Sequence, residues 1–154
     1  MRGFLLGVAL AVAAITGSAA AQDDHRRLTL GYLEHGLQRH AALGYAPDRT
    51  VPDITESLEL DRPFLWSVYL EAGVNYRVYG ACDNDCSDLD MEIYGVDGRF
   101  IERDAARDDT PYVQLTPAQS GRHYVRLWLY ECSAEPCWVA ARVVSGGRPA
   151  GRVE

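Results

Sequence analysis

Residues 64–94, FLWSVYLEAGVNYRVYGACDNDCSDLDMEIY, contain two runs in which every second side chain is apolar. The apolar positions are Phe64, Trp66, Val68 and Leu70 in the first run and Leu89, Met91 and Ile93 in the last. A period of two is typical of β-strands that bury one face, because successive side chains of a strand point to opposite sides. The stretch therefore predicts a β-rich fold.

The same period continues over residues 56–144, interrupted by turn-forming residues. The D-G pair at residues 97–98 predicts a hairpin turn, and Val125, Leu127 and Leu129 alternate with polar or aromatic neighbours. Several short strands with regular turn signals predict an all-β fold, an antiparallel β-sandwich. We expect residues 56–144 to form one such domain.

The preceding segment, residues 22–55, indicates a short helix followed by a linker. Apolar side chains at helical spacing predict the helix over residues 23–44, and they are Leu30, Leu33, Leu37 and Ala41. Gly31 and Gly36 oppose it, because a glycine within a helix costs about 1 kcal/mol relative to alanine. Two prolines within residues 45–55 indicate a linker, and the polar residues 145–154 indicate a disordered tail.

The first 21 residues have the three parts of a secretory signal peptide. Arg2 supplies a positive start, residues 4–15 are apolar, and residues 19–21 are three alanines that suit a cleavage site. The apolar run is too short to cross a bilayer as a helix. We therefore expect cleavage after Ala21, a mature chain without a transmembrane segment, and a periplasmic or secreted product.

The composition is acidic, with 22 aspartates and glutamates against 15 arginines, no lysine, and a formal net charge of −7. Nucleic acids and anionic lipids carry negative charge and would repel such a chain. The charge therefore excludes nucleic acid as an expected partner and is compatible with cations.

Four cysteines in an exported chain are typical of two disulfides. They form two close pairs, Cys82 with Cys86 and Cys132 with Cys137, and each pair brackets turn-forming residues. Four cysteines allow three connectivities, and the short spacings favour bonds within each pair. We expect disulfides Cys82–Cys86 and Cys132–Cys137 that staple two turns, rather than a free catalytic thiol or a zinc–thiolate site.

Three blocks of sequence resemble, in order, the bacterial pre-peptidase C-terminal (PPC) domain family. They are LEAGVNYRVYGACD at 70–83, DCSDLDMEIYGVDGRFIERD at 85–104 and TPAQSGRHYVRLWLYEC at 116–132. The resemblance implies a β-sandwich of jelly-roll type and a non-catalytic accessory module, which in the family is usually attached to a secreted peptidase. Related collagenase modules bind calcium and protein polymers. Residues 22–55 are too few for a catalytic domain, so we expect a free-standing exported module.

The acidic stretch CDNDCSDLD, residues 82–90, has two interpretations. Along the strand, every second residue from Asp88 to Glu92 is acidic and should point away from the apolar face. This is either a solvated face partly offset by Arg77 or Arg126, or part of a calcium site, since calcium takes 6–8 oxygen ligands. The candidate calcium ligands are Asp83, Asp85, Asp88, Asp90 and Asp104, with Asp108 or Asp109 as further oxygen donors.

A second candidate site is a row of large side chains on one predicted strand. Its members are Tyr124, Arg126, Trp128 and Tyr130, with Trp138 after the following turn. If this face is exposed, it suits sugar rings or a partner protein. If it is covered, the aromatic residues belong to the core.

Signatures of catalysis and of an obligatory cofactor are absent from the sequence. There is no G-x-S-x-G nucleophile elbow and no glycine-rich phosphate loop. His35 and His40 are five apart, which does not put them on one helical face, and His123 has no nucleophile beside it. We expect an exported binding module that contacts protein or polysaccharide, with calcium as an optional ligand. A structural, envelope-associated protein is the alternative, and a small hydrolase ranks last.

Overall fold

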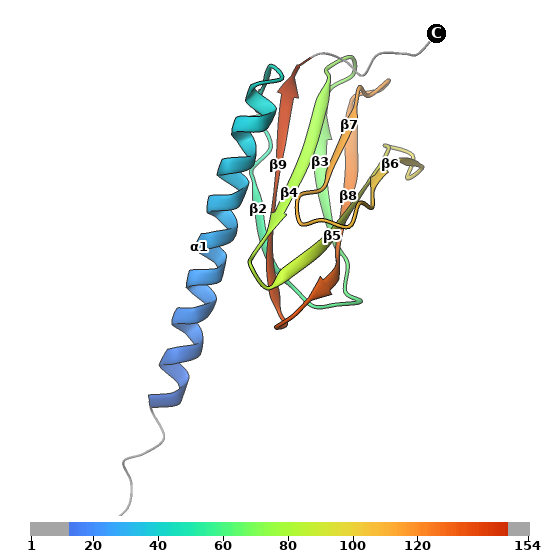
Figure 1. Cartoon of the computed structure of the whole chain (residues 1–154). Helices are drawn as coiled ribbons and strands as arrows, with labels where there is room; N and C mark the ends of the chain where they lie inside the picture. Colours follow the sequence, from blue (N-terminus) through green and yellow to red (C-terminus); the bar gives the residue numbers. More distant parts are fainter. Residues whose placement is uncertain (1–12, 148–154) are drawn as a thin grey trace, which may run out of the picture.

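The computed structural model describes residues 13–147, and it gives side chains from residue 20 onward. Over this range the chain forms one long helix, α1 (Ala13–Ala41), followed by nine strands (Figure 1). The strands are β1 (Tyr45–Pro47), β2 (Ile54–Leu58), β3 (Phe64–Leu70), β4 (Tyr76–Cys82), β5 (Cys86–Tyr94), β6 (Phe100–Asp104), β7 (Tyr112–Leu115), β8 (Gly121–Cys132) and β9 (Cys137–Gly146). Residues 1–12 of the expected signal peptide and residues 148–154 of the expected tail lie outside the described residues.

The strands form two antiparallel sheets. The first sheet has the order β1-β9-β4-β7, and β2 also pairs with β9; the second has the order β3-β8-β5-β6. Alternate side chains of both sheets meet in one apolar core, and its fully buried members include Val78, Leu89, Met91, Leu127 and Val139. The predicted antiparallel β-sandwich is therefore confirmed, whereas the jelly-roll connectivity stays a prediction.

The predicted hairpin turn at residues 97–98 is present between β5 and β6. Gly98 has a φ of +76°, which a glycine adopts without steric cost, and the N–H of Gly95 donates to the carbonyl of Arg99 at 2.8 Å. Strand β6 follows the turn. This strand was not predicted from the sequence, because its side chains do not alternate between apolar and polar.

Helix α1 packs on the side of the first sheet that is turned away from the second sheet (Figure 1). Leu33 is fully buried there, and the hydroxyl of Tyr79 on β4 donates to its carbonyl at 3.0 Å. A Cβ at Gly36 would lie 3.0 Å from Cε2 of Tyr79, so this glycine allows the ring to pack close to the helix. The helix is longer than expected and runs through the expected cleavage site after Ala21. Ala41, predicted to share the apolar face with Leu30, Leu33 and Leu37, is exposed.

The segment expected to be a linker contributes to the first sheet. Both β1 and β2 pair with β9, and residues 48–53 connect them. The sandwich therefore begins at Tyr45 rather than at residue 56. Within residues 13–147, no helix combines the length and the apolar character that crossing a membrane requires.

Candidate functional site

The outward side of the second sheet, here called the outer face, carries several exposed large side chains. On β3 and β8, inward residues are buried while Leu65, Tyr69 and Tyr130 point outward with 59–64% of their surface exposed. Tyr124, Arg126, Trp128 and Tyr130 occupy alternate positions of β8 and share the outer face, as the sequence predicts. The first three are only partly exposed, so the outer face is neither fully open nor part of the core.

Trp138, the fifth residue of the predicted binding surface, lies elsewhere. It is on β9 of the first sheet, and its indole Nε1 donates to Oε1 of Gln22 on α1 at 3.1 Å. The hairpin between β8 and β9 carries the chain from the second sheet to the first. Trp138 is therefore not part of the outer face.

Two of the three carboxylates of β5 on the outer face are paired with arginines. Oδ2 of Asp90 accepts a hydrogen bond from Arg103 at 2.8 Å, and Oε2 of Glu92 accepts one from Arg126 at 3.2 Å. Both carboxylates are buried. The expectation of a solvated face is therefore wrong. Arg126 does offset the charge, but Arg103 takes the place expected for Arg77.

The ring of Trp128 completes this network. The guanidinium carbons of Arg126 and Arg103 lie 4.2 Å and 4.9 Å from its centroid. Each arginine thus contacts a carboxylate and an aromatic ring together, and cation–π contacts of this kind add about 0.5–2 kcal/mol each. The network fixes the polar side chains of the outer face in one arrangement.

One carboxylate of the outer face has no such partner. Asp88 is 6% exposed, and its Oδ1 is buried without a hydrogen-bond partner among the described residues. Burial, reinforced by the nearby charges of Asp90 and Glu131, raises the pKa of the Asp88 carboxyl. An unsatisfied buried acceptor is costly, and this oxygen has almost no surface open to solvent, so a donor from outside reaches it only if a neighbouring side chain moves.

Asp88 lines a pocket of about 370 Å³ at one end of the outer face. The lining residues are Asp88, Asp90, Arg103, Ala105, Arg107, Tyr130 and Glu131. Glu131 is held by Arg107 and by the hydroxyl of Ser87, which donates to it at 3.0 Å. The pocket therefore combines one carboxylate without an arginine partner, two guanidinium groups and an exposed tyrosine.

The five predicted calcium ligands do not come together. Asp83 and Asp85 lie on the β4–β5 turn, whereas Asp88 and Asp90 lie on the outer face. Asp104 accepts the backbone N–H groups of residues 106 and 112 and so ties β6 to β7. Of the alternative ligands, Asp108 accepts the N–H of Thr110 at 2.9 Å, and Asp109 is exposed. Calcium binding stays a prediction.

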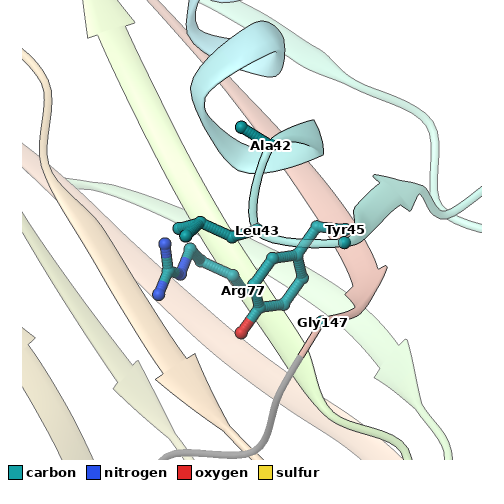
Figure 2. Close-up of a pocket in the computed structure, with 6 residues that line it drawn as sticks. Ala42, Leu43, Tyr45, Arg77 and Gly147 are labelled. Carbon is teal, nitrogen blue, oxygen red and sulfur yellow. The ribbon is translucent and has the colours of Figure 1, made fainter.

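Arg77 lies on β4 beneath the C-terminal end of α1 (Figure 2). It therefore does not offset the carboxylates of β5 on the second sheet, contrary to the expectation from the sequence. Its guanidinium carbon is 4.8 Å from the ring centroid of Tyr45 and 4.4 Å from that of Tyr112. His40 Nδ1 lies 3.3 Å from Arg77 Nη1. Burial, followed by the charges of Arg77 and Arg39, lowers the pKa of His40 to about 4. This cluster could not be predicted from the sequence, because its members come from four separate elements.

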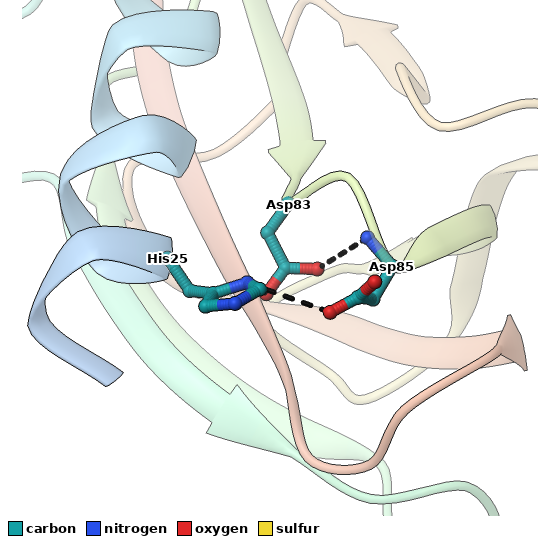
Figure 3. Close-up of side chains that lie close together, drawn as sticks. All are labelled: His25, Asp83 and Asp85. Carbon is teal, nitrogen blue, oxygen red and sulfur yellow. Dashed lines mark hydrogen bonds and ion pairs between the residues drawn. The ribbon is translucent and has the colours of Figure 1, made fainter. Parts of the chain in front are cut away.

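Two of the predicted calcium ligands meet a histidine of α1 (Figure 3). His25 Nδ1 lies 3.4 Å from Oδ2 of Asp83 and 3.6 Å from Oδ2 of Asp85. Within the described residues this is the one group of three or more His, Cys, Asp or Glu side chains close enough to share a metal ion. No sequence signal pointed to His25, because it is 58 positions from Asp83 and joins it only through the docking of α1.

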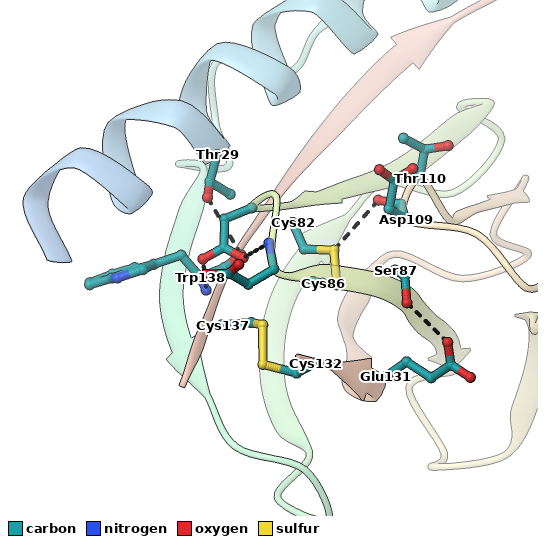
Figure 4. The surroundings of a disulfide bond; sticks show 12 residues. Thr29, Cys82, Cys86, Ser87, Asp109, Thr110, Glu131, Cys132, Cys137 and Trp138 are labelled. Atoms are coloured by element: carbon teal, nitrogen blue, oxygen red, sulfur yellow. Dashed lines mark hydrogen bonds between the residues drawn. A yellow bond between two sulfur atoms is a disulfide. The ribbon is translucent and has the colours of Figure 1, made fainter. Parts of the chain in front are cut away.

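Both disulfides are present with the predicted pairing (Figure 4). Cys82–Cys86 joins β4 of the first sheet to β5 of the second. Cys132–Cys137 joins β8 of the second sheet to β9 of the first. Cys86 and Cys132 are cross-strand partners, so the two bonds staple the sheets together at one end of the sandwich. The described residues contain no free cysteine. Two disulfides indicate an oxidising, extracellular type of environment.

His123 is buried, and its Nδ1 lies 3.0 Å from the carbonyl of Gly121, so it has a structural contact rather than a nucleophile beside it.

No family model matches the chain, and no curated protein matches it. The resemblance to the PPC domain family therefore stays a prediction that depends on the three blocks of sequence.

Proposed function

We propose that the protein is a non-catalytic binding module that holds a polysaccharide on the outer face of its second sheet. One observation carries the proposal: Asp88, a buried carboxylate with no arginine partner, lines a pocket together with Tyr130, which is 64% exposed. A ligand hydroxyl that donates a hydrogen bond to the Asp88 carboxylate gives this group a partner that the described residues do not supply.

The chemistry of the pocket suits a sugar ring better than a charged ligand. A sugar hydroxyl can donate to Asp88 and accept from Arg103 or Arg107, while its C–H face packs on Tyr130. Charges of both signs line the pocket, so neither an anion nor a cation is strongly favoured. The arginine–carboxylate network around Trp128 holds these groups in place before binding, which reduces the entropy lost when a ligand binds.

Binding without cleavage is favoured by the pairing of the neighbouring carboxylates. Hydrolysis of a glycosidic bond usually needs two carboxyl groups, one as acid and one as base or nucleophile. The raised pKa of Asp88 suits an acid, but Asp90 is paired with Arg103, and Glu131 with Arg107. A second free carboxylate is therefore not available in this pocket.

Export to the periplasm or beyond the cell belongs to the same proposal. The two disulfides and the signal-like residues 1–21 both support it. Intact mass measurement of the protein recovered from the producing cells tests it. We expect a chain that begins at Gln22, and recovery of the uncleaved chain from the cytosol would contradict export.

Affinity electrophoresis through gels that contain soluble polysaccharides, together with sedimentation on cellulose, chitin and peptidoglycan, tests binding. We expect retention by at least one polysaccharide. Tyr130→Ala should weaken that affinity at least tenfold, about 1.4 kcal/mol, because the exposed ring is lost. Asp88→Asn should also weaken it, because an amide is a poorer acceptor than a carboxylate.

Tyr32→Ala is the matched control, since Tyr32 is an exposed tyrosine on α1 at the opposite side of the sandwich. It should leave retention unchanged. Failure of every polysaccharide to retain the protein, or equal losses for Tyr130→Ala and Tyr32→Ala, would refute the proposal. Release of new reducing ends during incubation would identify a hydrolase instead.

A further inference from the structure

We propose that His25, Asp83 and Asp85 bind a divalent transition-metal ion of the Zn²⁺ type, and that this ion fastens α1 to the β4–β5 turn. The site lies on the first sheet, away from the outer face, and the inference does not depend on polysaccharide binding. Figure 3 shows the imidazole of His25 directed from the helix toward both carboxylates.

The two separations from the His25 nitrogen to the carboxylate oxygens fit a shared metal ion better than direct hydrogen bonds. His25 Nδ1 lies 3.4 Å and 3.6 Å from one oxygen of Asp83 and of Asp85, and all three ligand atoms lie within 4.8 Å of one another. These distances are long for N–H···O hydrogen bonds, which cluster at about 2.7–3.2 Å. Two ligands of a tetrahedral zinc ion with bonds of about 2.0–2.2 Å lie roughly 3.4 Å apart.

The turn that carries the two carboxylates is held in position from several sides. The Cys82–Cys86 disulfide closes the loop that contains both aspartates. Asp83 is 1% exposed, its Oδ1 accepts the N–H of Asp85 at 3.2 Å, and its Oδ2 accepts the N–H of Trp138 at 2.8 Å. Hydrogen bonds of this kind orient metal-ligating carboxylates. The carboxylate positions are therefore set before an ion arrives.

The helix side of the site is anchored as well. One turn after His25, the hydroxyl of Thr29 donates to the carbonyl of His25 at 2.9 Å, and Leu33 is fully buried against the sheet. His25 and Asp85 keep about a third of their side-chain surface exposed, at 34% and 29%. An ion can therefore enter from solvent between two elements that are already docked.

The donor set selects the kind of metal. Calcium and magnesium prefer oxygen ligands and six or more of them, or a shell of water. One imidazole nitrogen with two carboxylates is a set that zinc takes, with water as the fourth ligand. This inference changes the metal expected at Asp83 and Asp85 from calcium to a transition metal, because the third donor is a nitrogen.

Isothermal titration calorimetry on the disulfide-bonded chain, produced without a histidine tag, tests the site. We expect one Zn²⁺ bound per chain and calcium at least a hundredfold weaker. His25→Gln and Asp85→Asn should each weaken zinc at least tenfold, since each removes one of three ligands. Asp83→Asn is less useful, because Asp83 also holds the backbone of Trp138.

His35→Gln is the matched control, since His35 is an exposed histidine on the same helix. It should leave the zinc affinity unchanged. Absence of zinc binding, equal affinities for zinc and calcium, or the same loss in the His25 and His35 variants would each overturn the site. Circular dichroism of the His25 variant separates loss of a ligand from loss of the fold.

Discussion

Asp83 and Trp138, 55 positions apart, are joined by two hydrogen bonds. The backbone N–H of Asp83 donates to the carbonyl of Trp138 at 2.9 Å, and the N–H of Trp138 donates to Oδ2 of Asp83 at 2.8 Å. The side chain thus takes the place of a backbone acceptor where the pairing of β4 with β9 ends. The carboxylate is buried, so it fixes the start of β9 to the β4–β5 turn.

Replacing this carboxylate should destabilise the fold. Asp83→Ala leaves the N–H groups of Trp138 and Asp85 without their acceptor, and hydrogen bonds to a charged group contribute about 1.5–3 kcal/mol each. We expect a loss of at least about 3 kcal/mol in the free energy of unfolding, measured by urea denaturation. Asp109→Ala, at an exposed aspartate, should change it by less than about 0.5 kcal/mol. Similar losses for the two variants would contradict the role given to Asp83.

The two disulfides should contribute unequally. Each closes a short loop, for which the chain-entropy model gives roughly 2 kcal/mol. Replacing Cys132 and Cys137 together by alanine should lower the free energy of unfolding by about that amount. Replacing Cys82 and Cys86 should cost more and should also weaken zinc, because their loop carries Asp83 and Asp85. Urea denaturation and zinc titration of both double variants measure this, and equal effects on zinc would refute it.

The strand pattern could be predicted from the sequence because it depends on local alternation. Leu89, Met91 and Ile93 had to face one side of any β5, and they are fully buried in the core. The opposite side of the same strand could not be assigned in this way. Whether Asp90 meets water or an arginine depends on β6, which pairs with β5 and places Arg103 beside Asp90. Strand β6 has no apolar alternation, so the sequence did not predict it.

The candidate sites show the same limit. The alternation along β8 placed Tyr124, Trp128 and Tyr130 on one face, because all three lie on one strand. His25 was not found, because its position depends on how α1 docks on the first sheet. Gly36 shows why this docking is hard to predict. Its helix propensity opposes a helix, whereas in the structure it leaves room for Tyr79 to pack against that helix.

Stability should fall in mild acid because of His40. Its pKa is about 4 in the folded chain against 6.5 for an unperturbed histidine, since burial and then Arg77 and Arg39 disfavour its charge. Between these values the unfolded chain binds a proton that the folded chain does not, so stability is lost as the pH falls. From pH 7 to pH 4.5 we expect this group to cost about 2 kcal/mol.

His40→Gln removes the titrating ring and should reduce that loss, measured by urea denaturation at both pH values. His35→Gln, at an exposed histidine, serves as the control and should follow the unmodified protein. If His40→Gln loses as much stability in acid as the unmodified protein, His40 is not the group responsible.

Asp88 and Asp90 are two positions apart on the same face of β5, and their asparagine variants should change stability in opposite directions. Asp90→Asn weakens the buried contact with Arg103, and we expect a loss of about 1–2 kcal/mol. Asp88 has no arginine partner, and burial raises its pKa, so its charged form is disfavoured in the fold at neutral pH. Asp88→Asn should therefore stabilise the protein at pH 7.

The advantage of Asp88→Asn should disappear in acid, because a carboxyl with a raised pKa takes up its proton in the fold as the pH falls. Melting curves of both variants at pH 7 and in acid, each with calcium and with chelator, measure these effects. Calcium that binds only the folded state raises the melting temperature, and since Asp90 is held by Arg103 we expect no such rise through these two residues. A calcium-dependent rise that Asp90→Asn abolishes would instead establish Asp90 as a calcium ligand and would contradict the pairing with Arg103 as its main role.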